Sequence, residues 1–156
     1  MIDNTDIRPT LQSIPWLMDL SPDQIKELEK ISGFRFLSDG EILFNEGDDD
    51  NLLYIVSEGS LGVDIYVPGQ GQVRVYNAEP LDLVGWDRMT PVTRRRITTI
   101  TALQKCNLIY FNGKALHELC NKDKELGYLF TKRMSNVIAS RMLAIRIKLT
   151  DLLMQK

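Results

Sequence analysis

The 156-residue sequence has few of the side chains on which most catalytic and metal sites depend. It contains one histidine, His117, and two cysteines, Cys106 and Cys120, which form no Cys-x-x-Cys pair. A zinc site or a disulfide framework is therefore not expected. No nucleophile stands in a pattern that indicates an activating base, so we expect no catalytic residues, no metal and no enzymatic activity.

Long apolar runs and an excess of basic charge are also missing. No uninterrupted apolar run approaches the roughly 20 residues of a membrane helix, and the opening MIDNTDIRPT lacks the basic and apolar blocks of a signal peptide. The net charge is −2, with 19 basic and 21 acidic residues, whereas binding to nucleic acid usually needs a basic excess. We expect a reduced, cytoplasmic protein that does not enter membranes and does not bind DNA directly.

The residues that are present predict one domain in three blocks. Residues 1–33 form a helical lead-in, in which Ser21 and Gln24 make a capping box around Pro22. Residues 34–112 alternate short apolar runs with turn signals such as SDG, SEGS and PGQG, which is typical of an antiparallel barrel or sandwich. Residues 113–156 return to helical periodicity, with one long helix from Asp123 to about Gln155. The fold class is α+β.

In the long helix, five apolar residues alternate spacings of four and three. This seam consists of Ile138, Met142, Ile145, Leu149 and Leu152. Such spacing is typical of paired helices, although it also occurs in a helix that packs on its own domain. We expect the seam to join two subunits in a homodimer, because a buried stripe on an extended helix needs a partner.

The glycine pattern carries a family resemblance. The run FRFLSDGEILFNEGDDDNLLYIVSEGSLGVDI resembles the first half of a cyclic-nucleotide-binding domain, with Gly40, Gly47 and Gly59 at the three turn glycines of that family. The resemblance covers nearly the whole chain and is to catabolite-activator-like effector domains. It implies an antiparallel jelly roll, or double-stranded β-helix, with N-terminal helices and a long C-terminal helix.

The stretch LVGWDRMTPVTRRRITTITA resembles the phosphate-binding segment of the same family. Gly85 matches its glycine, Arg96 its arginine, and Thr98 and Thr99 its small hydroxyl pair. The resemblance implies that Arg96 pairs with the phosphate of cyclic AMP, cyclic GMP or another small phosphorylated ligand, with Arg95 in its place if the register shifts by one. No other cofactor is expected. The plain alternative is that arginines 94–96 are solvated or pair with Asp82 and Asp87.

Two positions depart from the family pattern. Leu81 replaces a glycine, and Trp86 replaces the glutamate that accepts a hydrogen bond from the ribose 2′-hydroxyl. Tryptophan has no acceptor, and an unpaired buried hydroxyl costs about 1–3 kcal/mol. Trp86 is either a stacking surface for a planar ligand or an apolar plug. The Gly-Trp pair resembles the sequence at this place in a bacterial branch of stand-alone domains of this fold. The Glu-Leu-Gly-Tyr stretch at 125–128 and the Arg141-Met142 pair also resemble motifs of that branch.

Three interpretations of function follow. The first is a regulatory sensor that binds a ligand in the barrel and signals through the long helix of a homodimer. The second is a ligand-free scaffold that docks onto another protein. The third is the effector part of a transcription regulator whose DNA-binding domain is not in this sequence. The acidic run at 48–50 lacks the spacing of a calcium loop and is expected to be a turn.

Overall fold

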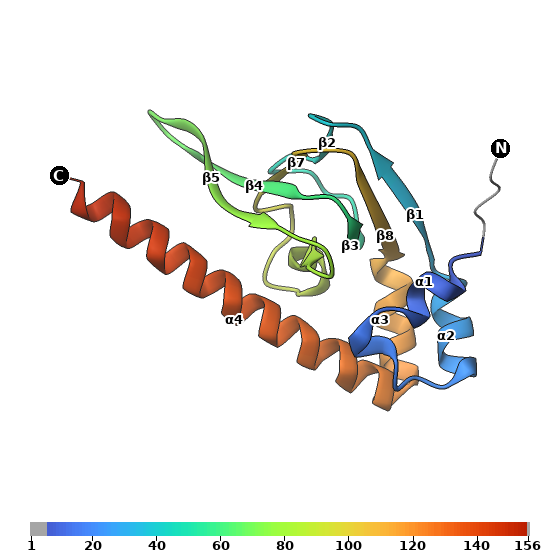
Figure 1. The fold of residues 1–156 in the computed structure, drawn as a ribbon. Helices are drawn as coiled ribbons and strands as arrows, with labels where there is room; N and C mark the ends of the chain where they lie inside the picture. The colour runs from blue at the N-terminus through green and yellow to red at the C-terminus, as the bar shows by residue number, and fades with distance from the viewer. Residues whose placement is uncertain (1–5, 156) are drawn as a thin grey trace.

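Two four-stranded antiparallel sheets form the body of the protein in a computed structural model that describes residues 6–155 (Figure 1). One sheet has the strand order β1-β8-β3-β6 and the other β2-β7-β4-β5. The strands are β1 (Ser32–Leu37), β2 (Ile42–Phe44), β3 (Leu52–Glu58), β4 (Leu61–Val67), β5 (Gly71–Ala78), β6 (Leu83–Val84), β7 (Thr99–Ala102) and β8 (Cys106–Asn112). This is the predicted jelly roll, and its first strand begins two residues before the expected residue 34. Residues 1–5 and Lys156, which the predicted domain includes, lie outside the described residues.

Strand β3 divides the core into two clusters because its side chains alternate between the two faces of its sheet. Tyr54 and Val56 belong to the cluster inside the sandwich, which also contains Phe44 and Val84. Leu53 and Ile55 belong to a second cluster, between this sheet and the helices. All four of these β3 side chains are buried. A strand paired on both sides and covered on both faces is expected to be continuously apolar.

Short helices cover one end of the sandwich. They are α1 (Arg8–Gln12), η1 (Pro15–Leu17), α2 (Pro22–Glu29) and α3 (Gly113–Lys122), and they pack beside the first half of α4 (Lys124–Met154). The predicted capping box of α2 is present, because Ser21 Oγ accepts from the Gln24 amide at 3.2 Å and Gln24 Oε1 from the Ser21 amide at 2.9 Å. Asp123 caps α4 and also accepts a hydrogen bond from Gln24 Nε2 at 3.0 Å. This contact joins the start of α4 to the N-terminal helices.

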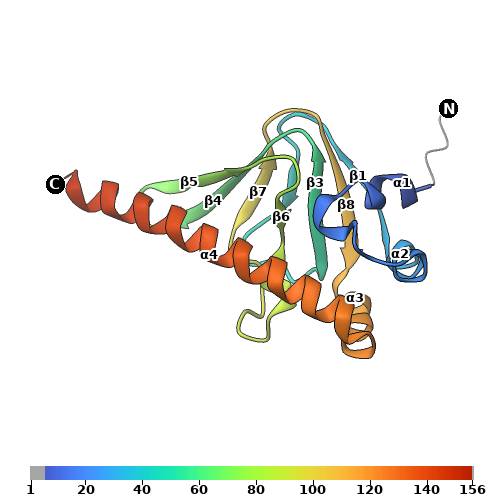
Figure 2. The ribbon, with the colours of Figure 1, turned by 60° about the horizontal axis from the view of Figure 1, so that its bottom comes forward.

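Helix α4 runs from this helical end past β5 toward the β4–β5 hairpin (Figure 2). Its first half is held by the core, where Leu126, Phe130 and Val137 are buried. Beyond Val137 none of its described residues is buried, and most of its apolar side chains face solvent. Among the described helices, none combines the length and the hydropathy that a membrane span requires.

Candidate functional site

The predicted phosphate-binding segment connects β6 to β7 through η2 (Trp86–Met89). It begins at Gly85, whose φ of 80° is in the left-handed region that favours glycine. A Cβ atom at Gly85 would lie 2.8 Å from both Arg96 Nη1 and the Leu52 carbonyl oxygen. The glycine therefore lets the backbone turn and also lets the Arg96 guanidinium approach it.

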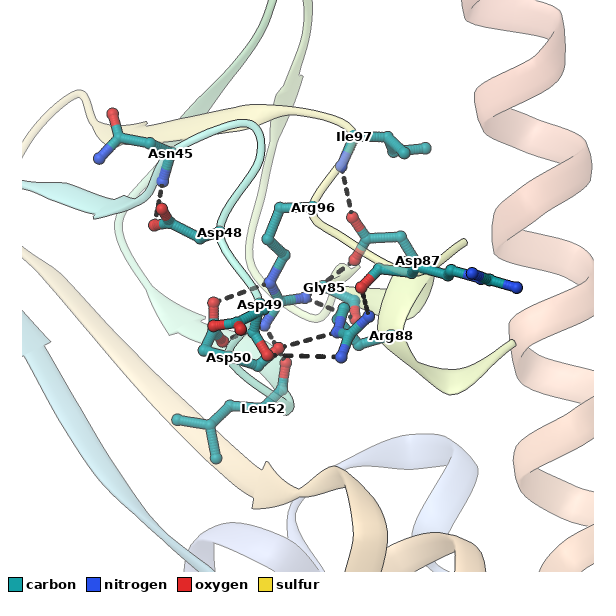
Figure 3. Close-up of polar contacts among 11 residues, drawn as sticks. Asn45, Asp48, Asp49, Asp50, Leu52, Gly85, Asp87, Arg88, Arg96 and Ile97 are labelled. Carbon is teal, nitrogen blue, oxygen red and sulfur yellow. Dashed lines mark hydrogen bonds and ion pairs between the residues drawn. The ribbon is translucent and has the colours of Figure 1, made fainter. Parts of the chain in front are cut away.

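Arg96 lies at the centre of the segment and has a fully buried side chain (Figure 3). Its Nε donates to Asp50 Oδ2 at 3.0 Å, and its Nη1 donates to Asp87 Oδ1 at 2.8 Å and to the Gly85 carbonyl at 2.9 Å. Its Nη2 donates to the Leu52 carbonyl at 2.6 Å and to Asp50 Oδ1. A guanidinium has five N–H donors. All five are therefore satisfied within the chain, and the arginine has none left for a phosphate.

The charges around Arg96 also oppose a bound anion. Burial alone would lower the pKa of Arg96, but the hydrogen bonds and charges of Asp50 and Asp87 outweigh it and raise the pKa. The guanidinium thus stays charged, and it also lies 4.0 Å from the centre of the Phe44 ring. Two carboxylates thus already face the guanidinium at the position where the resemblance implies a phosphate.

Asp87 is fixed from both sides. Its residue is 3% exposed, and its second oxygen, Oδ2, accepts from the Ile97 amide at 2.9 Å. The alternative interpretation of arginines 94–96 was that they are solvated or pair with Asp82 and Asp87. In the structure, Arg96 does pair with Asp87. Asp82, the other carboxylate of that alternative, instead pairs with Arg141 of α4 at 3.2 Å.

Asp50 comes from the acidic run at 48–50, which the sequence predicts to be a turn. The loop is held to the segment by Arg88, whose Nε donates to the Asp50 carbonyl at 2.9 Å and whose Nη2 donates to the Asp49 carbonyl at 3.3 Å. The Arg96 amide donates to the Asp48 carbonyl at 2.7 Å. The role of Asp50 as a partner of Arg96 was not predicted. The only hint in the sequence was an acidic run with no assigned partner.

The other predicted ligand residues have separate partners. Arg95 is exposed and donates from Nη1 to the Gly47 carbonyl at 3.0 Å. Thr99 is buried, and its Oγ1 accepts from the Glu46 amide at 2.9 Å, whereas Thr98 is half-buried. The structure thus brings Gly85 and Arg96 into contact and directs Arg95 to Gly47, in the loop that also carries Asp50. Ligand binding by these residues stays a prediction.

Comparison with known proteins places this geometry in a family. Residues 34–123, more than half of the chain, match the cyclic nucleotide-binding domain. The chain belongs to this family. A search of curated proteins found no match.

Solved structures share the fold of this cyclic nucleotide-binding domain. A putative cyclic nucleotide-binding protein from Geobacter metallireducens is 18% identical with a TM-score of 0.72, over 91% of this chain and 99% of that chain. The sensor domain of the transcriptional regulator DNR from Pseudomonas aeruginosa is 21% identical with a TM-score of 0.71, over 86% and 90% of the two chains. The catabolite activator protein of Thermus thermophilus is 18% identical with a TM-score of 0.69, over 88% and 62%. The chain thus shares its fold with regulatory sensor domains.

In this cyclic nucleotide-binding domain, Trp86 is linked to helix α4. Trp86 is half-buried and packs against the cluster between sheet and helices. Burial raises the pKa of Tyr76 overall, although the charge of Arg141 lowers it. The Arg141 guanidinium lies 4.2 Å from the centre of the Tyr76 ring and pairs with Asp82. Trp86 therefore packs on a cluster to which α4 contributes, and Tyr76 and Arg141 join β5 to the same helix.

A cleft of about 570 Å³ lies outside the predicted ligand site, between the end of η2, helix α3 and helix α4. Its lining includes Met89, His117, Cys120, Phe130 and Met134. Burial raises the pKa of the Cys120 thiol to about 11, so this thiol is protonated at neutral pH. Among residues 6–155, no group of three or more His, Cys, Asp or Glu side chains is placed to hold a metal ion.

Proposed function

We propose that this chain is a regulatory module of the cyclic-nucleotide-binding fold whose nucleotide site is closed by its own carboxylates. It acts without cyclic nucleotide, as a homodimer that presents its surface to another protein. The observation that carries the proposal is the use of all five N–H donors of Arg96 by acceptors within the chain. Asp50 and Asp87 hold the charge that a cyclic phosphate would bring.

The energetic cost of opening this site supports the proposal. A phosphate on Arg96 has to displace at least one carboxylate, so its hydrogen bonds to the guanidinium replace existing ones instead of adding to them. Displacement of Asp87 would also take the acceptor away from the Ile97 amide. The missing acceptor at Trp86 costs about 1 kcal/mol for the ribose hydroxyl. A cyclic nucleotide therefore gains little net binding energy from this site.

The second half of α4 supports assembly into a dimer. Four residues of the predicted seam are exposed in one copy, with Ile138 at 38%, Met142 at 71%, Ile145 at 50% and Leu149 at 54%. Leu152, the fifth, is half-buried. A helix with this much exposed apolar surface is stabilised when a partner covers it.

Calorimetry tests the closed site. We expect no heat of binding when cyclic AMP or cyclic GMP is titrated to millimolar concentration. A dissociation constant below about 100 µM for either nucleotide would overturn the proposal, because binding of that strength would mean that the nucleotide displaces the carboxylates. Light scattering in the same buffer is expected to give twice the mass of one chain.

A second candidate is a sensor whose phosphorylated ligand displaces only Asp50. The observation in its favour is that the Asp50 side chain is 35% exposed, whereas that of Asp87 is 4% exposed. Under this alternative, Asp50→Asn binds cyclic AMP more tightly than the parent chain. Asp87→Asn is the matched control, because it also removes one carboxylate charge but from the closed side. Equal absence of binding in both variants excludes the sensor.

A further inference from the structure

Two adjoining hollows lie outside the predicted nucleotide site, next to η2 and α3. The larger is the cleft of about 570 Å³ between η2, α3 and the first half of α4, and the smaller has a volume of about 320 Å³. Both are lined by Met89 and His117, so they form one continuous site. Pockets that bind small molecules commonly have volumes of about 300–1,000 Å³. The two hollows therefore have the size of a ligand site.

The larger hollow lies where α3 and α4 approach each other closely. A Cβ atom at Gly127 would lie 2.5 Å from the Cys120 carbonyl oxygen, so only glycine permits this approach without a shift. Methionine side chains adapt their shape to what they pack against, and two of them line this hollow. Its apolar lining is Met89, Pro91, Cys120, Tyr128, Phe130 and Met134. The larger hollow thus suits an apolar group.

Arg88 brings a cation with unused donors to the smaller hollow. Its Nε and Nη2 donate to the carbonyls of Asp50 and Asp49 at 2.9 and 3.3 Å (Figure 3). Its Nη1 donates to the Arg94 carbonyl. Three of the five N–H donors of a guanidinium are thereby used, and one N–H on each terminal nitrogen has no acceptor among residues 6–155. All partners of Arg88 are neutral carbonyls, whereas Arg96 has two carboxylates.

The charges around the smaller hollow suit a monoanion. Lys114 and Glu118 line it beside Arg88, and none of the three belongs to an ion pair in the described part of the chain. With His117 neutral, these groups leave one positive charge, and Lys124 adds another in the larger hollow. A carboxylate brings one negative charge and accepts two parallel N–H bonds from an arginine. A phosphate monoester carries up to about two negative charges and matches the smaller hollow less well.

We propose that the two hollows bind an apolar carboxylate, a compound with one carboxylate group and an uncharged acyl or aromatic body. The body lies in the larger hollow, and the carboxylate accepts from Arg88 in the smaller one, with Lys114 beside it. The inference goes beyond the proposed function, because this ligand leaves Arg96 and its partners in place. Since Met89 belongs to η2 and Met134 to α4, the ligand connects the predicted phosphate-binding segment to the long helix.

Calorimetry on the full chain tests the ligand class with simple probes. Octanoate represents an acyl body and 1-naphthoate an aromatic one, and 1-octanol is the matched compound without the carboxylate. We expect saturable binding of at least one acid with one site per chain. Octanol should bind at least about tenfold more weakly than octanoate if the acyl acid is the one bound, because it cannot accept the charged hydrogen bonds of Arg88. Absence of saturable binding for both acids, or octanol binding as tightly as octanoate, would overturn the proposal.

Charge variants locate the carboxylate. Arg88→Gln is expected to weaken binding of the acid at least about tenfold, as for the loss of a charged hydrogen bond. Because Arg88 also holds the loop at 49–50, Lys114→Gln is a second variant that leaves this loop intact, and it should weaken binding about threefold or more. Lys122→Gln, an exposed position on the same helix outside both hollows, is the control. Parent-like binding in both Arg88→Gln and Lys114→Gln contradicts the assignment.

A filling variant and amide hydrogen exchange locate the body. Thr131→Trp fills the larger hollow from an exposed position and should prevent binding, whereas Lys132→Trp, exposed but outside the hollow, should not. In the parent chain, the acid should slow exchange in residues 86–91 and 127–134. Slowing only in residues 143–154 would mean adsorption to the exposed apolar side chains of α4 and would contradict the site. Binding of cyclic AMP would contradict the proposed function alone, because that ligand concerns Arg96 and not these hollows.

Discussion

The Nη1 nitrogen of Arg96 lies 2.8 Å from Oδ1 of Asp87, with both side chains almost completely removed from solvent. Ion pairs of this kind are costly to desolvate, and their effect on stability depends on complete hydrogen bonding. Here the hydrogen bonding is complete on both sides, because every N–H of Arg96 and both oxygens of Asp87 have partners. The pair therefore holds the predicted phosphate-binding segment in one conformation through contacts within the chain.

Removal of the Asp87 charge is expected to destabilise the fold. Asp87→Asn keeps the size of the side chain but leaves Arg96 with only part of its compensating charge. We expect a loss of about 3 kcal/mol in the free energy of unfolding, the lower end of the range for a broken buried pair. The midpoint of urea denaturation measures this. Asp49→Asn, in the exposed part of the same acidic run, is the control and should leave the midpoint unchanged.

The positive φ angles at Leu81 and Gly85 lead us to expect opposite changes in stability for two substitutions. Leu81 has a φ of 75° and is the one non-glycine residue with positive φ among the described residues. Leu81→Gly relieves this strain, and after the entropy cost of glycine we expect a gain of about 1 kcal/mol in stability. Gly85→Ala adds a Cβ 2.8 Å from Arg96 Nη1 and is expected to lose at least about 2 kcal/mol. Thermal denaturation of both variants checks the signs. A less stable Leu81→Gly chain would show that the contacts of the Leu81 side chain stabilise the fold by more than its backbone strain destabilises it.

Leu81 stands where the family pattern has a glycine, and only the structure shows that it keeps the positive φ that a glycine favours. The sequence predicted the jelly roll and the turn at Gly85, because turn glycines and alternating strands are local signals. It assigned the phosphate arginine to Arg96, with Arg95 as the alternative, and this assignment stays a prediction. It did not predict Asp50, because this residue is 46 positions away in the chain and its carboxylate is part of a run that is typical of a solvated turn. Only the packing of the 45–51 loop onto the segment just before β7 brings the two together.

The position of Trp86 was also beyond local sequence signals. Its lack of an acceptor predicted a damaged ribose site, and that argument needs only the chemistry of the indole. Its packing on the cluster between the sheet and the helices depends on how β6, η2 and α4 meet. Long-range contacts of this type have no periodicity for a sequence to reveal.

Arg141 is expected to hold the second half of α4 on the barrel. Arg141→Gln loses both the ion pair with Asp82 and the contact with the Tyr76 ring. We expect amide hydrogen exchange in α4 beyond Val137 to become at least tenfold faster, while exchange in β3 stays unchanged. Lys132→Gln, an exposed position on the same helix, is the control. Unchanged exchange in Arg141→Gln would mean that α4 is positioned by other contacts.

The stabilisation that the Asp123 carboxylate gives to the fold is expected to be lost in acid. Hydrogen bonds from Gln24 and from the Leu126 amide lower its pKa below the ordinary value of 3.8. A lowered pKa in the folded state means that the stabilisation is complete above the unfolded pKa and is lost as the pH falls through the folded pKa. Asp123→Ala is expected to cost about 1 kcal/mol at pH 7, as for other N-cap residues.

The comparison with Asp123→Asn isolates the titration. Asparagine also caps helices well, so this variant should keep most of the stability at pH 7. Because it does not titrate, the difference in unfolding midpoint between it and the parent chain should shrink between pH 5 and pH 3. A difference that is constant across this range would contradict the lowered pKa.

The Arg96 side chain offers the most direct measurement of the closed site. In a nitrogen-15 NMR spectrum, the Nε–Hε group of Arg96 should exchange slowly with water, because the side chain is buried and donates to Asp50. The account predicts that this signal stays at the same position when cyclic AMP is added to 5 mM or so, a concentration at which a micromolar site is saturated. A signal that shifts or broadens with increasing cyclic AMP, and saturates, would show that the nucleotide displaces the carboxylates and would contradict the account.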